Sequence, residues 1–179
     1  MRIIGGTHRS RWIQFSDTGD VRPTPDRVRE TLFNWLGQSL HGKRCLDLFA
    51  GSGALGFEAV SRGAQEVVMV EKDRAAFRAL QENCKNLGCA NATVRCMDSL
   101  EFARGPDRPY DVIFLDPPFR SGYLPGILSL LPDKLTEDGV VYVETGEPFD
   151  PGAMWEVIRH SRAGKVFYQL LRLQGNGTV

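Results

Sequence analysis

The chain has 179 residues, which is enough for one domain with a sizeable hydrophobic core and short for two. With 42% hydrophobic and 25% charged residues, it has the composition of an ordinary soluble globular protein. No apolar run is long enough to cross a bilayer, and the first residues lack the apolar segment of a signal peptide. We therefore expect a cytoplasmic protein without a membrane span.

The basic residues are unevenly placed, although the formal net charge is zero. The first fifteen residues carry three arginines and no acid, and three more arginines follow by position 29. Such a basic arm can hold a polyanion locally even on a neutral chain. A solvated, flexible terminus accounts for the charge pattern equally well.

The cysteine and histidine spacing argues against a zinc site. The four cysteines form no C-x-x-C pair, and the three histidines are scattered, so we expect no bound metal. We expect instead buried or half-buried thiols in a reducing compartment. The cysteines concerned are Cys45, Cys84, Cys89 and Cys96.

Residues 1–21 are predicted to form a short extended arm or hairpin, because glycines and the turn sequence SDTGD interrupt them. A helix is predicted over Arg22–Leu36 from its spacing of apolar residues. Its start is indicated by Thr24 as the cap, Pro25 at the first helical position and Asp26 in the first turn.

From Lys43 onward, predicted strands and helices alternate. The strands are Arg44–Phe49, Glu66–Glu71, Ala92–Cys96, Tyr110–Leu115 and Gly139–Glu144. The helices are Ala54–Arg62, a segment capped by Asp73 that continues to Leu87, and a leucine-rich segment around Leu124–Leu131. Near-continuous Val/Ile/Leu strands separated by helices are typical of a parallel α/β sheet covered on both faces.

The end of the chain has a different pattern. Trp155–Arg162 and Lys165–Leu173 flank Ala163 and Gly164 and alternate without an intervening helix. This spacing predicts an antiparallel hairpin that ends the sheet.

The segment LDLFAGSGALGFEA (Leu46–Ala59) runs from a strand through a glycine turn into a helix. Gly51 and Gly53 allow the backbone to turn sharply and to approach a ligand, at the sheet edge where open α/β sheets bind their ligands. Glu71 closes the second strand, where a carboxylate can accept hydrogen bonds from ribose hydroxyls. Asp98 follows the third strand, where it can meet the amino edge of an adenine. Together these residues predict an adenosine-containing cofactor.

Two cofactor classes fit this pattern. Gly51, Gly53 and Gly56 satisfy the G-x-G-x-x-G spacing of dinucleotide enzymes. Asp47 and Phe49, in D-x-F-x-G-x-G, favour the other class, because a carboxylate there would repel a pyrophosphate but could hold the ammonium of a methionine moiety. The sequence thus favours S-adenosylmethionine over NAD, and an NAD-dependent oxidoreductase is the alternative from another functional class.

The segment LDPPF follows the fourth predicted strand and cannot continue a helix or a central strand. The Asp116 carboxylate and the Pro117 carbonyl can each accept one N–H of an exocyclic amine on a nucleobase, which would aim the nitrogen lone pair at a methyl donor. Pro117 and Pro118 would keep these acceptors still, and Phe119 could stack on the base. The predicted chemistry is a direct in-line methyl transfer that depends on positioning, without a metal or a covalent intermediate.

These residues resemble the class I S-adenosylmethionine-dependent methyltransferases that modify amino groups of nucleobases. The motifs RIIGG, RPTPDRVRETLFNWL, CLDLFAGSGALGFEA and FLDPPF narrow the resemblance. They are similar to those of the bacterial small-subunit (16S) ribosomal RNA guanine-N2 methyltransferase family, known for modifying guanine-966.

The resemblance implies a doubly wound, Rossmann-like α/β sheet of seven strands, mostly parallel with an antiparallel C-terminal hairpin. It implies an RNA-gripping extension, residues 1–40, and a methyltransferase domain, residues 41–179. It also implies 16S ribosomal RNA in a small-subunit particle as the substrate and S-adenosylmethionine as the cofactor. We expect the protein to act as a monomer.

Residue by residue, the implied site is as follows. The cofactor would be bound by Arg22, Thr24, Asp47, Phe49, Gly51, Gly53, Glu71, Lys72, Asp98, Ser99 and Asp116. The guanine would be held by the catalytic residues Asp116, Pro117, Pro118 and Phe119. RNA would be bound by Arg2, Arg9, Arg11, Arg22 and Arg27.

One position departs from the family pattern: Ser10 stands between Arg9 and Arg11 where the family usually has a glycine, so the turn geometry of the arm is open. Other functions also remain open. The same acceptors would serve a DNA or RNA methyltransferase acting on adenine N6 or cytosine N4. A non-catalytic RNA-binding module with this fold is a further alternative, disfavoured by the complete DPPF segment.

Overall fold

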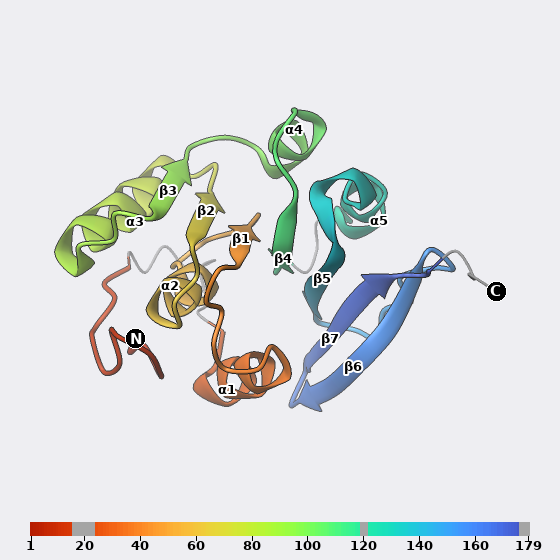
Figure 1. Ribbon diagram of the computed structural model, residues 1–179, viewed down its shortest axis with the longest axis horizontal. Helices are drawn as coiled ribbons and strands as arrows, with labels where there is room; N and C mark the ends of the chain where they lie inside the picture. The colour runs from red at the N-terminus through yellow and green to blue at the C-terminus, as the bar shows by residue number, and fades with distance from the viewer. Residues whose placement is uncertain (16–23, 119–121, 176–179) are drawn as a thin grey trace.

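The computed structural model describes residues 1–15, 24–118 and 122–175 (Figure 1). Arg22 and Phe119, both assigned to the site from sequence, lie outside the described residues, as does the predicted turn at 16–20. The strands are β1 (Arg44–Asp47), β2 (Glu66–Val70), β3 (Ala92–Arg95), β4 (Tyr110–Leu115), β5 (Leu135–Thr145), β6 (Trp155–Ala163) and β7 (Val166–Leu173). The α-helices are α1 (Asp26–Trp35), α2 (Ala54–Ser61), α3 (Arg74–Leu87), α4 (Ser99–Arg104) and α5 (Leu124–Leu128), and a 3₁₀ turn spans Pro132–Lys134.

The strands form one seven-stranded sheet in the order β3-β2-β1-β4-β5-β7-β6, which can be followed across Figure 1. The first five strands pair in parallel, and β7 pairs antiparallel with both β5 and β6. This topology confirms the predicted doubly wound sheet and its antiparallel C-terminal hairpin. The chain runs outward from β1 to β3 and returns to β4, so the strand order reverses between β1 and β4. The carboxyl ends of these two neighbours form the crevice in which such sheets bind ligands.

Successive residues of the central strands face opposite layers of the core. Cys45 and Met69 lie in one hydrophobic cluster, and Leu46 and Val68 lie in the other. This alternation explains why these strands are continuous apolar runs in the sequence, because both of their faces are covered. Helices α1, α2 and α3 contribute to the first cluster, whereas α4 and α5 contribute to the second.

The N-terminal segment is a packed hairpin. Its strands meet at an antiparallel bridge between Arg2 and Trp12, and the side chains of Ile3 and Ile13 are buried in the core. A flexible, solvated terminus is therefore the wrong interpretation of this basic segment. The structure also shows the backbone conformation at Ser10, where the family usually has a glycine. Its φ of 68° lies in the left-handed region that glycine adopts freely, at a cost to serine of roughly 1–2 kcal/mol.

The start of α1 differs from the prediction. Pro25, with φ −56° and ψ 149°, is the residue that precedes the helix, so Asp26 takes the first helical position. Thr24 does not cap the helix, because its hydroxyl instead lies near carboxylates of other elements. A further difference is α4, which was not predicted from the sequence and which begins at a cap supplied by Asp98.

The cysteine expectation is correct for three of the four thiols. Cys45 is buried, and Cys84 and Cys89 are half-buried, but Cys96 is exposed. The exposed position follows from its place after the edge strand β3, which no further strand covers. All four thiols are free. Within the described ranges, no helix is long and apolar enough to cross a membrane.

Candidate active site

The glycine turn lies between β1 and α2, at the reversal of strand order. Gly51 and Gly53 have φ values of 55° and 85°, which L side chains rarely adopt. At Gly53 a side chain would also collide with the Phe57 ring. Gly56 has an ordinary helical backbone, and a Cβ there would press on the Met69 side chain, so its role is close helix–strand packing. Side chains accept from amides at the start of α2: the Ala54 amide donates to Ser52 Oγ, and the Gly56 amide donates to Asp47 Oδ2.

Asp47 ends β1 beneath this turn and is 1% exposed. Its Oδ2 atom accepts a hydrogen bond from the Gly56 amide at 3.2 Å, whereas Oδ1 is buried without a hydrogen-bond partner among the described residues. Burial raises the pKa of Asp47 to about 7, against the opposing effect of the Gly56 amide. A buried carboxylate oxygen with no donor calls for a cationic or donating ligand group. This arrangement suits an ammonium and opposes a pyrophosphate.

Glu71 follows β2 and holds the glycine turn in place. Its Oε2 atom accepts from the Gly51 amide at 2.9 Å, and Oε1 accepts from the Asp73 amide at 3.0 Å. Each carboxylate oxygen keeps further acceptor capacity for a ligand hydroxyl. Lys72, the next residue, is exposed, and its Nζ lies 5.9 Å from the centre of the Tyr123 ring. The tie between Glu71 and the turn was not anticipated from sequence.

The third strand leads into a capped helix. The Oδ1 atom of Asp98 accepts from the amides of Leu100 at 2.9 Å and Glu101 at 3.2 Å, and Ser99 is buried in the first turn of α4. Asp98 is half-buried, and its carboxylate stabilises the start of α4 through these two hydrogen bonds. An aromatic pair lies near this edge: the rings of Phe49 and Tyr123 are 5.9 Å apart.

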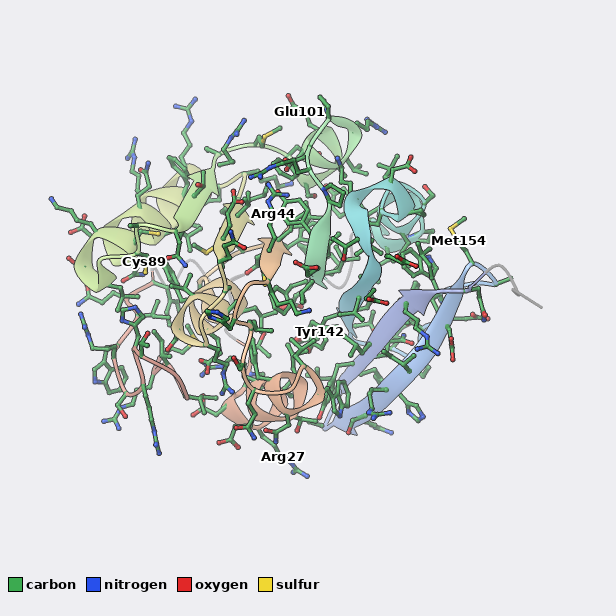
Figure 2. The ribbon with its side chains drawn as sticks, in the orientation of Figure 1. Arg27, Arg44, Cys89, Glu101, Tyr142 and Met154 are labelled. Atoms are coloured by element: carbon green, nitrogen blue, oxygen red, sulfur yellow. The ribbon has the colours of Figure 1, made fainter. Side chains whose placement is uncertain are left out.

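Asp116 follows β4 and belongs to a cluster that sequence reasoning did not foresee. The Thr24 hydroxyl lies 3.4 Å from Asp116 Oδ2 and also 3.4 Å from Glu144 Oε2, and the Tyr142 hydroxyl donates to Glu144 Oε2 at 2.9 Å. Tyr142, labelled near the centre of Figure 2, and Glu144 are both buried. One feature of the sequence could have indicated Glu144 as a site residue: β5, like β1 and β2, is an apolar strand with an acid at its carboxyl end. Pro117 is buried and Pro118 is exposed.

The negative charges of Asp116 and Glu144 would repel each other in this cluster. Burial, followed by the charges of Glu144 and Asp47, holds the pKa of Asp116 well above its usual range, while the Thr24 hydroxyl opposes the shift. Burial also raises the pKa of Glu144, against the hydrogen bonds from Tyr142 and Thr24. Whether Asp116 is ionised therefore depends on the charge of the group bound beside it.

The arginines assigned to RNA lie on two elements. Arg2, Arg9 and Arg11 are exposed on the N-terminal hairpin, and Arg27 projects outward from α1 in Figure 2. The Arg2 guanidinium covers the exposed Trp12 ring at 4.7 Å from its centre. Arg11 donates to the Asn86 carbonyl at the end of α3. Arg9 borders a surface hollow of about 630 Å³ between the hairpin and α1.

Comparison with known proteins identifies the fold as that of class I methyltransferases. The model of the family described as Conserved hypothetical protein 95 matches residues 1–172, and the chain belongs to this family. A relative from Escherichia coli K12 named ribosomal RNA small subunit methyltransferase D is 42% identical over 183 residues, which is 99% of this chain and 92% of its own. A protein of the same name from Haemophilus influenzae is 40% identical over 178 residues, covering 95% of this chain and 92% of its own.

Solved structures agree. The putative methyltransferase yhhF from Escherichia coli has a TM-score of 0.88 and 41% identity, over 97% of this chain and 98% of that one. A putative methylase from Haemophilus influenzae has a TM-score of 0.81 and 39% identity, over 95% and 96% of the two chains. The resemblance drawn from the sequence motifs is thereby confirmed.

Proposed function

We propose that the protein uses S-adenosylmethionine to methylate the exocyclic N2 amine of a guanine in 16S ribosomal RNA. The target implied by the resemblance is guanine-966. The observation that supports the proposal is the placement of Asp116 and Pro117 beside β1, where the buried Oδ1 atom of Asp47 has no hydrogen-bond partner among the described residues and could accept from a cationic ligand group. The names of the relatives support ribosomal RNA of the small subunit as the substrate.

The cofactor would lie across the carboxyl ends of β1, β2 and β3. Asp47 would hold its ammonium, Glu71 its ribose hydroxyls, and Asp98 with Ser99 its adenine, and the turn at Gly51 and Gly53 would lie against it. S-adenosylmethionine supplies an electrophilic methyl group on a sulfonium. The positive charge of that sulfonium would favour the ionised form of Asp116.

Asp116 and Pro117 would prepare the amine. The Asp116 carboxylate would accept one N–H and the Pro117 carbonyl the other, so that the nitrogen lone pair points at the methyl group. The cofactor would supply the methyl group to the nitrogen and would leave as the neutral thioether, and Asp116 would accept the proton lost by nitrogen. The contribution of the protein is chiefly orientation.

The N-terminal part of the chain, residues 1–40, would grip the RNA, and residues 41–179 would form the methyltransferase domain. Arg9 would contact a phosphate at the hollow beside α1, and Arg27 would contact a phosphate from its exposed position on α1. We propose that the protein acts in the cytoplasm as a monomer on small-subunit particles.

The proposed substrate can be tested by offering small-subunit particles, naked 16S RNA and duplex DNA side by side with methyl-labelled cofactor. Mass spectrometry of the digested nucleosides should show N2-methylguanosine from the ribosomal substrate. Label only in DNA, or as N6-methyladenine or N4-methylcytosine, would reject the proposal. Calorimetry with NADH against S-adenosylhomocysteine tests the oxidoreductase alternative in the same preparation.

We expect Glu71→Ala to weaken S-adenosylhomocysteine binding by roughly 10- to 100-fold, because hydrogen bonds to a charged acceptor contribute about 1.5–3 kcal/mol. The substitution removes both the ribose acceptor and the tie to the Gly51 amide. Isothermal titration calorimetry measures the affinity. Glu82→Ala, on the exposed face of α3, is the matched control. An unchanged affinity would show that Glu71 does not bind the ribose hydroxyls.

Replacing Arg9 and Arg11 together with alanine should weaken RNA binding and flatten its salt dependence. Each lost phosphate contact lowers the slope of log affinity against log salt by about 0.7–0.9. Fluorescence anisotropy at several salt concentrations measures this slope, and Arg159→Ala on the exposed side of β6 serves as the control. A slope equal to that of the wild type would show that these arginines of the hairpin do not contact RNA phosphates.

A further inference from the structure

Glu144, which the proposed mechanism does not use, lies in a buried chain of polar groups. The chain runs from the Tyr142 hydroxyl to Glu144, then to the Thr24 hydroxyl, and ends at Asp116, which is half-buried. The first three of these residues are at most 4% exposed. Only Asp116 of this group borders the proposed position of the reacting amine.

The Thr24 hydroxyl has one proton and lies 3.4 Å from both carboxyl groups. It can therefore donate to only one of them at a time. If both carboxyl groups were ionised, the Thr24 hydroxyl could donate to only one of them. Its oxygen lone pairs would then face the lone pairs of the other carboxylate with no proton between them. One additional proton removes this conflict, because a protonated carboxyl donates to the threonine oxygen while threonine donates to the other carboxylate.

We propose that Glu144 is a positioning residue that shares one proton with Asp116 through the Thr24 hydroxyl, and that methyl transfer requires this proton to lie on Glu144. The inference rests on the proposed function of Asp116. The exchange is balanced: Asp116 Oδ2 gives a proton to Thr24 Oγ while the threonine proton passes to Glu144 Oε2. Asp116 is then an oriented carboxylate that can accept an N–H bond from the amine.

The surroundings explain why the shared proton matters at working pH. Asp116 faces Glu144 from β5 and Asp47 from β1, and both negative charges raise its pKa. Glu144 faces Tyr142, which in turn lies near Tyr168 of β7. Burial raises the pKa of Tyr142 well above its usual range, so the Tyr142 hydroxyl carries no charge at neutral pH. A cation bound near Asp47 and Asp116 would move the proton toward Glu144.

Glu144→Gln separates this role from a purely structural one. Glutamine can donate permanently to the Thr24 oxygen, as protonated Glu144 would, and it removes the charge that raises the pKa of Asp116. Wild-type Glu144 loses the required proton as pH rises, whereas glutamine keeps its donor. The alkaline limb of the kcat/KM profile should therefore move to higher pH, so the ratio of variant to wild-type rate rises with pH. Glu147→Gln, the same change on the exposed loop after β5, should leave the profile in place. Superimposable profiles for wild type and Glu144→Gln would overturn the proposal.

Thr24 supplies the second arm of the test. Thr24→Val, which keeps the shape but loses the hydroxyl, should lower kcat by about tenfold or more across the pH range. Thr24→Ser should restore most of the rate. Equal rates for the valine and serine variants would show that the hydroxyl does not connect the two carboxyls.

A readout independent of RNA distinguishes failure of this inference from failure of the proposed function. Carboxyl ¹³C NMR can follow Asp116 and Glu144 during a pH titration, with and without S-adenosylhomocysteine. The wild type should show two linked titration steps, and Glu144→Gln should reduce the Asp116 curve to one step. An Asp116 curve that is identical in both proteins would rule out the shared proton, even if guanine methylation is observed.

Discussion

Asp116→Ala is expected to lower the rate of methyl transfer by at least about 100-fold while leaving the affinity for S-adenosylhomocysteine nearly unchanged. The substitution removes the carboxylate that would accept one N–H of the amine and then its proton. The Pro117 carbonyl alone would leave the base free to rotate about a single hydrogen bond. The cofactor would keep its contacts with Asp47 and Glu71, which are held by other strands.

Single-turnover kinetics with labelled cofactor measures the rate, and calorimetry measures the affinity. Asp138→Ala, an exposed acid on β5, is the control for loss of a carboxylate on the same sheet. Equal losses of rate and affinity would make Asp116 part of the cofactor pocket instead of the guanine pocket.

Glu58→Ala is expected to have the largest effect on stability, a loss of about 3–5 kcal/mol in the free energy of unfolding. Glu58 and Arg29 are both 0% exposed, and Glu58 accepts hydrogen bonds from the amides of Ile4 at 3.0 Å and Gly5 at 2.9 Å. Its ion pairs with Arg29 and Arg62 are 3.5 Å and 2.9 Å long. Alanine would leave the Ile4 and Gly5 amides with no acceptor. It would also remove one of the two carboxylates paired with Arg29, which keeps Asp26 and the carbonyls of Thr24 and Arg2 as acceptors.

Denaturant titration measures the loss, and limited proteolysis should show earlier cleavage within the N-terminal hairpin, because the hairpin amides are the groups released. Glu82→Ala is again the exposed control. Glu58→Gln should be milder, because the amide oxygen keeps one acceptor for the hairpin. A loss below about 1 kcal/mol for Glu58→Ala would show that the hairpin is held mainly by other contacts, namely the burial of Ile3 and Ile13 and the hydrogen bonds to Ser61 and Asn83.

Local patterns were sufficient to predict the strands and the glycine turn. The apolar runs at β1, β2 and β4 are short and buried on both faces, so composition alone identifies them. The sharp turn at Gly51 and Gly53 was likewise expected from the strand-turn-helix spacing, and both residues have positive φ values. These features depend on residues within a few positions of each other, and a linear pattern records them.

The amino-acid sequence by itself determined the class of fold, the glycine turn and the identity of the acids that end β1 and β2. The tertiary structure decided which distant groups those acids meet. Thr24 is 92 positions from Asp116 and 120 from Glu144, and Ile4 is 54 from Glu58. Such contacts follow from the order in which strands pair, not from neighbouring residues. Thr24 therefore looked like a helix cap in the sequence, and folding placed it between two carboxyl groups.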